Sequence, residues 1–178
     1  MRIIGGKYKG RIVKPGKNFR ARPTTDLARE GLFNILTNRI DFEELEILDL
    51  FSGTGSISFE FASRGCKNIT LVENDPMHLK FIVKAIKELD ISGIEPIKAD
   101  VFRFIKKTGQ KFDLIFADPP YELKELQNIP SHVFDSEILK PGGQLILEHP
   151  KSYSFSNHRN FTELRRYGSV HFSFFKGE

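Results

Sequence analysis

Short apolar runs of strand length recur through the middle of the chain, and segments rich in glycine, proline and charged residues separate them. Runs of this kind predict buried strands, and helical patterns lie between several of them. Alternating strands and helices are typical of an α/β protein with a mostly parallel sheet. We therefore expect strands at residues 47–50, 69–73, 94–100, 112–117 and 144–148.

Helical spacing of apolar residues marks two segments that follow predicted strands. Ile57 and Phe61 lie four residues apart directly after a glycine-rich turn, so we expect a helix there. An amphipathic helix is predicted after the strand at 69–73, because lysines separate apolar residues that share one helical face. These apolar residues are Leu79, Ile82, Ile86 and Leu89.

The first forty residues carry a different pattern, in which basic residues are interleaved with glycines and apolar residues. Residues 2–4 and 10–13 are expected to pair as a short hairpin. A helix should follow, capped by Thr24, Thr25 or Asp26. Its expected buried face holds Ala28, Leu32, Ile35 and Leu36. We therefore divide the chain into a small N-terminal extension of hairpin and helix, residues 1–40, and a larger α/β domain, residues 41–178.

Strands and helices in this order predict a doubly wound, Rossmann-like sheet. In such a sheet the first three strands step outward, and the fourth returns to lie beside the first. The carboxyl ends of strands one and four then flank a crevice at the switch point. Residues 161–167 and 170–175, joined at Gly168-Ser169, are expected to add an antiparallel hairpin at the C-terminal end of the chain.

A glycine-rich turn follows the first predicted strand, as in the opening of a nucleotide-binding βαβ unit. Because Gly53 and Gly55 lack a Cβ, they would let the backbone approach a ligand closely. The dinucleotide fingerprint needs a third glycine at position 58, where this chain has serine, so a dinucleotide site is the weaker alternative. An acid inside the strand end would instead attract a cation, such as the amino or sulfonium group of S-adenosylmethionine. The candidate cofactor residues of this segment are Asp49, Phe51, Gly53, Thr54 and Gly55.

Two further strands also end in acidic residues. Glu73, with Asn74 beside it, lies about 20 residues beyond the glycine turn, where an acid binds ribose hydroxyls. Asp100, followed by Val101, is placed to meet an adenine amino group. Either acid alone is more typical of a solvated turn, but acids at four successive strand ends indicate a pocket.

The fourth strand leads into Asp118-Pro119-Pro120-Tyr121, the most informative motif of the chain. Neither proline has an N–H group, so the backbone leaves the sheet stiffly while its carbonyl groups remain available as acceptors. Carboxylate and carbonyl can accept hydrogen bonds from an exocyclic amine while the tyrosine ring stacks on its base. The plainer reading is a strand followed by a Pro-Pro turn. We interpret all four residues as the catalytic site for a nucleobase amine.

Length and composition are compatible with one compact enzyme. The 178 residues include seventeen Phe and no Trp, and they can bury a sizeable core. No run approaches the length of a membrane span, and the polar start is unlike a signal peptide. One cysteine, Cys66, excludes an internal disulfide, suits a reducing cytoplasm and is interpreted as structural. The five scattered histidines offer no spacing typical of a metal site, so we expect no metal.

Positive charge is concentrated at the start of the chain. Residues 1–30 contain nine Lys or Arg against two acids, whereas the whole chain has a net charge of only +4. This asymmetry predicts an arm that binds a polyanion, and the interleaved Gly, Tyr and Phe favour nucleic acid. The alternative is that these basic residues form an ordinary solvent-exposed surface. The candidate RNA-binding residues are Arg2, Lys7, Lys9, Arg11, Arg20, Arg22 and Thr24.

With these motifs in place, the chain resembles the bacterial RsmD family, the small-subunit rRNA guanine-N2 methyltransferases. The likeness covers nearly the whole chain, and its distinctive segments are Arg22-Pro23-Thr24-Thr25-Asp26 and the run from Arg29 to Leu36. The glycine turn and the Asp-Pro-Pro-Tyr motif recur across amino-methyltransferases and are less specific. The remaining matching segment is 1–11.

The resemblance implies a class I methyltransferase fold, with a seven-stranded sheet, and S-adenosylmethionine as the methyl donor. It implies methylation of one guanine of 16S rRNA, 966 in the standard rRNA numbering, within an assembled or assembling 30S subunit. It is also in keeping with a cytoplasmic enzyme, which we expect to be a monomer that binds no membrane.

Two alternatives remain open on the sequence alone. An adenine-N6 methyltransferase acting on DNA shares the Asp-Pro-Pro-Tyr motif. An RNA-binding assembly factor without enzymatic activity would need only the basic arm. Intact Asp49, Gly53, Gly55 and Asp118 argue against the second alternative.

Overall fold

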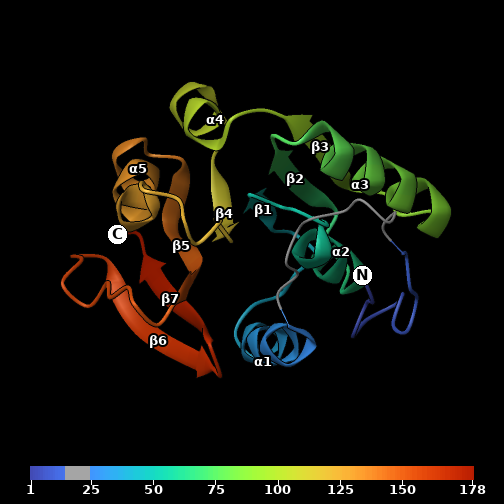
Figure 1. Cartoon of the computed structure of the whole chain (residues 1–178), viewed down its shortest axis with the longest axis horizontal. Helices are drawn as coiled ribbons and strands as arrows, with labels where there is room; N and C mark the ends of the chain where they lie inside the picture. Colours follow the sequence, from blue (N-terminus) through green and yellow to red (C-terminus); the bar gives the residue numbers. More distant parts are fainter. Residues whose placement is uncertain (15–24) are drawn as a thin grey trace.

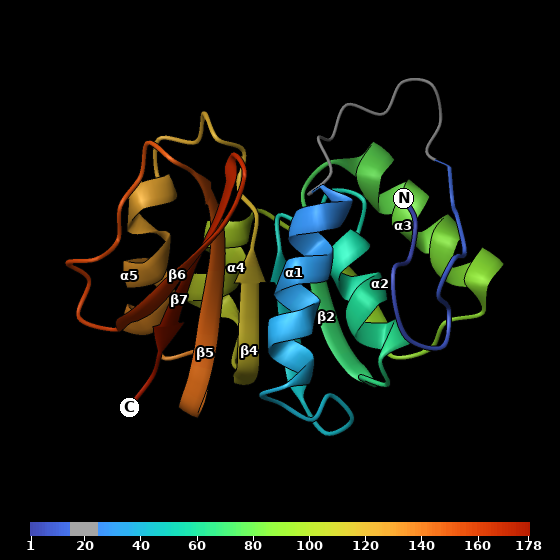
Figure 2. The same cartoon turned by 90° about the horizontal axis from the view of Figure 1, so that it is seen from below.

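The computed structural model describes residues 1–14 and 25–178, and Figures 1 and 2 show its strands and helices. The strands are β1 (Glu46–Leu50), β2 (Asn68–Glu73), β3 (Ile94–Lys98), β4 (Phe112–Ala117), β5 (Leu139–Pro150), β6 (Phe161–Tyr167) and β7 (Val170–Lys176). The helices are α1 (Asp26–Thr37), α2 (Ser56–Ser63), α3 (Pro76–Leu89), α4 (Val101–Lys107), the short 3-10 helix η1 (Leu126–Asn128) and α5 (Ile129–Asp135).

The strands form one seven-stranded sheet in the order β3-β2-β1-β4-β5-β7-β6. Strands β3, β2, β1, β4 and β5 are parallel, whereas β7 pairs antiparallel with both β5 and β6. The predicted doubly wound fold and its terminal hairpin are therefore confirmed. Strands β1 and β4 are neighbours, so the switch point lies where the chain order requires it.

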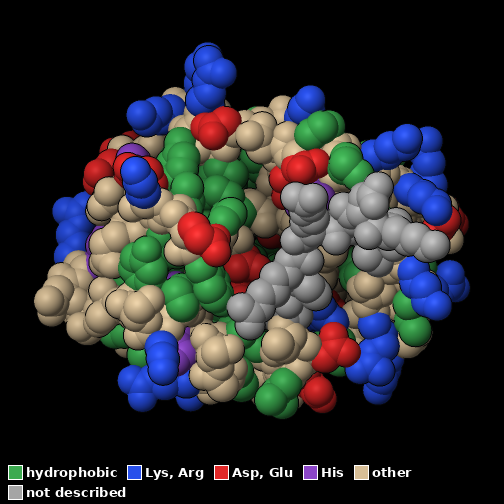
Figure 3. All heavy atoms as spheres, viewed as in Figure 1, with side chains coloured by type: hydrophobic (Ala, Val, Ile, Leu, Met, Phe, Trp, Pro, Cys, Tyr) green, Lys and Arg blue, Asp and Glu red, His purple; other side chains and the backbone are tan. Residues whose placement is uncertain are grey.

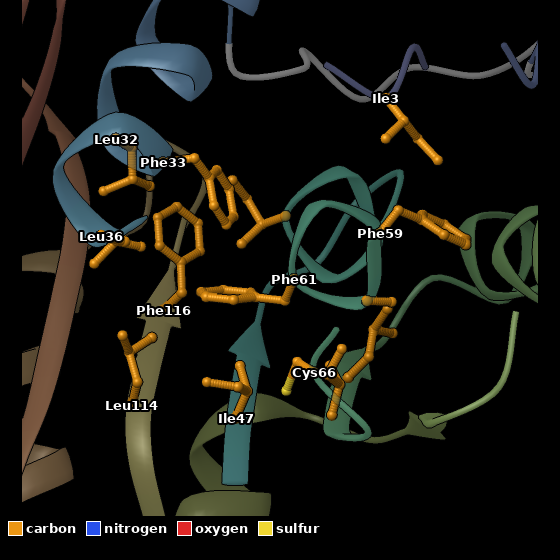
Figure 4. Close-up of a cluster of buried hydrophobic side chains, with 14 of the residues drawn as sticks. Ile3, Leu32, Phe33, Leu36, Ile47, Phe59, Phe61, Cys66, Leu114 and Phe116 are labelled. Carbon is orange, nitrogen blue, oxygen red and sulfur yellow. The ribbon is translucent and has the colours of Figure 1, made fainter. Parts of the chain in front are cut away.

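Helices cover both faces of the sheet, because the central strands are apolar on both sides. Helices α1, α2 and α3 pack on one face, together with alternate strand residues such as Ile47 and Phe116. Helices α4 and α5 pack on the other face, against Leu48 and Ile115. Figure 4 shows the first of these cores, in which the rings of Phe33 and Phe61 meet edge to face with centroids 4.9 Å apart.

The N-terminal hairpin forms part of this core. An isolated bridge joins Arg2 to Ile12, and the amide of Ile3 donates to the carbonyl of Arg11 at 3.0 Å. The side chains of Ile3 and Val13 are buried beside α2, which is buried along its whole length. Because α2 lies between the sheet and the hairpin, it has no solvated face, and its apolar sequence follows from that position.

A buried carboxylate fixes the hairpin to α2. Glu60 accepts a hydrogen bond from the backbone amide of Ile4 at 2.6 Å and forms ion pairs with Arg29 and Arg64. Arg29 is only 1% exposed and also donates to the carbonyl of Arg2 at 2.7 Å. Burial lowers the pKa of Arg29. Although Arg29 counts among the basic residues of the arm, it belongs to the core and is not available to a polyanion.

Several boundaries differ from the expected ones. β5 begins at Leu139, before the expected start at residue 144, because a bulge lets the pairing resume at Gln144. β3 ends at Lys98, and Asp100 caps the next helix. Thr25 is the cap of α1, as one of the three predicted possibilities.

The buried helix faces also differ in part from the predicted ones. On α1, Phe33 is buried and Ile35 is only half-buried. On α3, the buried residues include Phe81 and Ala85, while Ile86 is half-buried. The helical spacing of apolar residues predicted the correct buried side of both helices. The centre of each buried face, however, differs slightly from the predicted one.

Cys66 is buried just beyond the end of α2, where its thiol donates to the carbonyl of Leu45 at 3.3 Å. Burial raises the pKa of this thiol, which keeps it protonated and unreactive at neutral pH. Among the described helices, none combines the length and the apolar character that a membrane span needs.

Candidate active site

A cavity of about 870 Å³ opens beyond the carboxyl ends of the five parallel strands, β1 to β5. Figure 3 shows Asp and Glu side chains in and around the central hollow of this face, while Lys and Arg side chains lie mostly toward its edge. Most predicted site residues of the body of the protein line the cavity: Phe51, Gly53, Thr54, Glu73, Asn74, Asp100, Val101, Asp118, Pro120 and Tyr121. The exceptions are Asp49, Gly55 and Pro119.

Glu73 organises the glycine turn. Its Oε2 accepts a hydrogen bond from the amide of Gly53 at 2.7 Å, and its Oε1 accepts one from the amide of Asp75 at 2.8 Å. The Nδ1 atom of His78 lies 3.7 Å from Oε2. Strand register explains the contact, because β1 and β2 end side by side. Glu73 therefore holds the turn in shape, and its predicted contact with ribose hydroxyls stays a prediction.

Two further acids begin helices at the cavity wall. Asp75 caps α3 by accepting from the amides of Met77 and His78, and these backbone donors lower its pKa. Asp100 caps α4 by accepting from the amide of Arg103 at 2.9 Å. Both carboxylates are thus held in place by the backbone that follows them. Asp100 lines the cavity as predicted, while Asp75 was not anticipated.

Asp49 lies behind the glycine turn and is 1% exposed. Its Oδ2 accepts hydrogen bonds from the hydroxyl of Ser58 at 2.6 Å and from the amide of Ser58 at 3.2 Å. Burial raises the pKa of Asp49 to about 7, although the bonds from Ser58 oppose the shift. The structure thus places Asp49 against the first turn of α2, whereas we expected it to face a cationic donor directly. The serine at position 58, where a dinucleotide site has glycine, is its partner.

The two glycines of the turn have different reasons for being glycine. Gly53 lines the cavity, and its φ of 55° is in the left-handed region. Gly55 also has a positive φ, 72°, but a Cβ there would meet the core atoms of Phe59, Leu71 and Ile82 at 3.1–3.3 Å. The expected role in ligand approach therefore fits Gly53, while Gly55 serves the turn and the packing of α2.

Phe51 lines the cavity in a strained conformation. Its φ of 58° is left-handed, which costs about 1–3 kcal/mol for a bulky residue. Hydrogen bonds from the hydroxyl of Ser52 to the carbonyls of Asp49 and Val72 hold the segment in place. The ring of Phe51 packs edge-on against that of Phe102, with centroids 6.1 Å apart. These rings form an aromatic wall that suits a flat heterocycle.

The Asp-Pro-Pro-Tyr motif lies directly across the switch point from the glycine turn. The amide of Asp118 donates to the carbonyl of Leu50 at 3.3 Å, so the motif begins beside the end of β1. Pro119 is buried, whereas Pro120 and Tyr121 line the cavity. The hydroxyl of Tyr121 donates to Oε1 of Glu148 at 3.2 Å.

Glu148 is a site residue that the sequence reasoning missed. It is 3% exposed, lies near the end of β5 and lines the cavity. We expected residues 144–148 only as a strand, yet the signal was present, because this fifth strand also leads to an acid. The rule that identified four strand-end acids would have identified Glu148 if it had been applied once more.

Apart from the buried Arg29, the basic residues of the described part of the arm are exposed at the surface. Lys7 and Arg11 lie over the ring of Tyr8, at 5.3 and 5.9 Å from its centroid, and Lys9 is also exposed. Arg2 forms an ion pair with Asp26 at 2.7 Å. The other candidate RNA-binding residues, Arg20, Arg22 and Thr24, lie outside the described residues.

Metal ligands do not gather at this site. Across residues 1–14 and 25–178, no group of three or more His, Cys, Asp and Glu side chains has an arrangement that could hold a metal ion. The most buried histidine, His149, bonds through its ring nitrogens to Ser173 and to the carbonyl of Pro150, and burial lowers its pKa. The described lining of the cavity includes carboxylates, backbone groups and aromatic rings.

Comparison with known proteins gives consistent similarities along the whole chain. The family model described as conserved hypothetical protein 95 matches residues 1–176. Ribosomal RNA small subunit methyltransferase D of Haemophilus influenzae is 31% identical over 169 residues, which cover 93% of this chain and 86% of that protein. The solved structure of the putative methyltransferase yhhF from Escherichia coli has a TM-score of 0.86 and 25% identity, and covers 100% of this chain and 98% of its own. The putative methylase HI0767 from Haemophilus influenzae has a TM-score of 0.80 and 28% identity, with coverage of 99% and 97%.

Proposed function

Because the chain belongs to the RsmD family of S-adenosylmethionine-dependent rRNA methyltransferases, whose model is described as conserved hypothetical protein 95, we propose that it methylates the exocyclic N2 amine of a guanine in 16S rRNA. The target we propose is guanine 966 of the standard numbering. The observation that carries the proposal is the juxtaposition of the Asp118 motif and the Gly53 turn in one cavity. A donor loop and an amine-binding loop must meet in this way for methyl transfer.

The residues of the cavity fit S-adenosylmethionine. The cavity volume of about 870 Å³ lies within the range of small-molecule binding sites. Glu73 and Asp100 offer carboxylates for ribose hydroxyls and an adenine amine, and the rings of Phe51 and Phe102 offer an apolar wall. When bound, this donor supplies an activated methyl group on a sulfonium. The acidic lining favours such a cationic group electrostatically.

Residues of the other half of the cavity would prepare the guanine amine. This amine is a poor nucleophile, because its lone pair is delocalised into the ring. Hydrogen bonds from its two N–H groups to Asp118 and to the carbonyl of Pro119 would turn the lone pair toward the methyl carbon. Tyr121 would stack on the flipped base. No strong base is needed before attack, so Asp118 acts mainly by orientation and accepts the proton late.

The basic N-terminal hairpin would bind the RNA backbone while the guanine enters the cavity. Lys7, Lys9 and Arg11 are exposed, and their charges can contact phosphates without reading the base. An unpaired guanine in a loop can be splayed out more easily than one in a helix. We propose that the monomeric protein acts in this way on 16S rRNA within an assembled or assembling 30S subunit.

The test supplies labelled donor with 16S rRNA, with 30S particles and with genomic DNA, all taken from a strain that lacks this gene. We expect label in the RNA or the particle, and mass analysis should place the methyl group on N2 of guanine 966. Methylation of adenine in DNA would favour the adenine-N6 alternative and overturn the proposal. RNA binding without any donor binding in calorimetry would show a non-enzymatic assembly factor.

A further inference from the structure

We propose that Glu148 determines specificity, because its carboxylate accepts the N1–H of the target guanine and thereby selects guanine over bases without that donor. The inference rests on the proposed function, since it assigns a role in recognising the guanine of that reaction. Three features carry it: the place of Glu148 beside Asp118, its hydrogen bond with Tyr121, and the donor pattern of guanine.

Strand register places Glu148 next to Asp118. Ala117 of β4 pairs with Leu147 of β5, so the following residue of each strand emerges at the same level. Neighbouring strands are about 4.8 Å apart. Phe116 and Ile146, two positions earlier, both point into the core beneath α1 and α2. Because side chains alternate along a strand, Asp118 and Glu148 leave the sheet on that same face, and both line the cavity.

Glu148 is a buried carboxylate in the wall of the cavity. A carboxylate that is 3% exposed must be hydrogen-bonded to offset its desolvation, and an apolar residue such as Ile146 fills an equivalent position on the strand without that cost. The hydroxyl of Tyr121 donates to Oε1 at 3.2 Å. A carboxylate has about four acceptor positions, so one carboxylate can bind several donors at once, such as a hydroxyl and a ring N–H. The stacking residue and the carboxylate are thus joined in one unit.

Guanine matches two adjacent carboxylates, and adenine does not. The edge of guanine presents N1–H directly beside the N2 amine, which gives neighbouring donors. If Asp118 accepts from the amine, an acceptor beside it meets N1–H. Adenine presents an unprotonated N1 beside its amine, so a second carboxylate would face a lone pair. The pairing of Asp118 with Glu148 therefore attracts guanine and repels adenine, as specific recognition requires.

The experiment compares guanine with 2-aminopurine at the target position of 16S rRNA in small-subunit particles. 2-Aminopurine keeps the amine but has an acceptor at N1. For wild type we expect kcat/KM to favour guanine. In Glu148→Gln, whose amide can donate to N1, the preference should fall by roughly 10- to 100-fold. The intrinsic reactivities of the two amines are the same for both enzymes, so the change in preference reports on residue 148.

Tyr121→Phe is the matched control, because it keeps the ring and removes the bond to Glu148. This variant should lower activity on both bases and keep the preference for guanine. If Glu148 only positions Tyr121, then Glu148→Gln would likewise lower both activities with the preference unchanged, which would overturn the inference alone. If wild type methylates neither base, the proposed function itself fails. Equal donor affinity in all three proteins, measured by calorimetry, confirms that they are folded.

Discussion

The cavity has two halves. In the half proposed to bind the methyl donor (the donor half), at the ends of β1 to β3, backbone amides close in sequence or on the next strand donate hydrogen bonds to the carboxylates. Glu73 accepts from Gly53 and Asp75, and Asp100 accepts from Arg103. In the acceptor half, at the ends of β4 and β5, Glu148 accepts from the hydroxyl of Tyr121, 27 residues away. Backbone amides thus bind the carboxylates of the first half, whereas Glu148 in the second half binds a side chain distant in the sequence.

This difference separates two tasks. Backbone amides keep their positions when neighbouring side chains change, so the donor half is preorganised for an invariant cofactor. A side-chain pair can be altered by a single substitution, which suits the half that selects one base. Substitutions in the acceptor half should therefore change turnover or base choice, and those in the donor half should change donor affinity or stability.

The largest expected effect is on turnover. Asp118→Ala should lower kcat by more than about 1,000-fold, or about 4 kcal/mol of barrier, because the amine is no longer oriented. Donor affinity in calorimetry should stay near that of wild type. Glu44→Gln, which removes an exposed carboxylate before β1 at the opposite end of the sheet, is the control and should be fully active. A loss of turnover below tenfold in Asp118→Ala would contradict the orienting role.

The next effect concerns stability and pH. Because the pKa of Asp49 is about 7 in the folded protein, this carboxyl group stays protonated there between about pH 4 and 7, whereas in the unfolded chain it is ionised. The folded state therefore loses stability as pH rises through this window. Asp49→Asn has no titrating group at this position and does not lose stability in this way. Its free energy of unfolding relative to that of wild type should therefore rise by up to about 4 kcal/mol from pH 4 to above pH 7.

Urea unfolding of both proteins without donor, at several pH values, measures this difference. Other titrating groups are common to the two proteins and cancel in the comparison. If the two stability profiles run parallel, Asp49 has an ordinary pKa in the folded state, and its position behind the turn would need another explanation.

Donor affinity should respond to Glu73. Glu73→Gln keeps the shape of the side chain but loses charge and weakens the bonds to Gly53 and Asp75. We expect the dissociation constant for S-adenosylmethionine to rise about 10- to 150-fold, as for a lost charge-assisted bond of about 1.5–3 kcal/mol. At saturating donor, kcat should change little. A large fall in kcat with unchanged donor affinity would reverse the assignment of the two halves.

The smallest effect should come from the hairpin. Neutralising Lys7, Lys9 and Arg11 to Gln should weaken RNA binding and flatten its salt dependence by roughly 2 in slope, about 0.7 for each phosphate contact on a single strand. Donor binding should not change. The matched control removes three exposed lysines near the amino end of β4, Lys106, Lys107 and Lys111. If the salt dependence of RNA binding has the same slope in the two triple variants, the hairpin residues do not contact phosphates and have only a structural role.

The sequence alone predicted the doubly wound fold, its switch point and ten of the 21 described residues that line the cavity. These features follow from local rules: apolar runs make strands, and acids at the ends of parallel strands gather at one edge of the sheet. Positions such as Phe51, Glu73 and Tyr121 could be identified because a short motif carries each of them. The same local rules extend to the capping of α1 by Thr25.

Tertiary structure decided which charged residues face the cavity or solvent and which are buried. Arg29 belongs to a charged stretch of sequence, but Glu60 of α2 and the carbonyl of Arg2 take it into the core. Asp49 ends inside the protein because Ser58 meets it from α2, and Glu148 joins the site because β5 pairs beside β4. The direction and solvation of each of these side chains depend on partners from segments distant in the chain, and no local pattern records such partners.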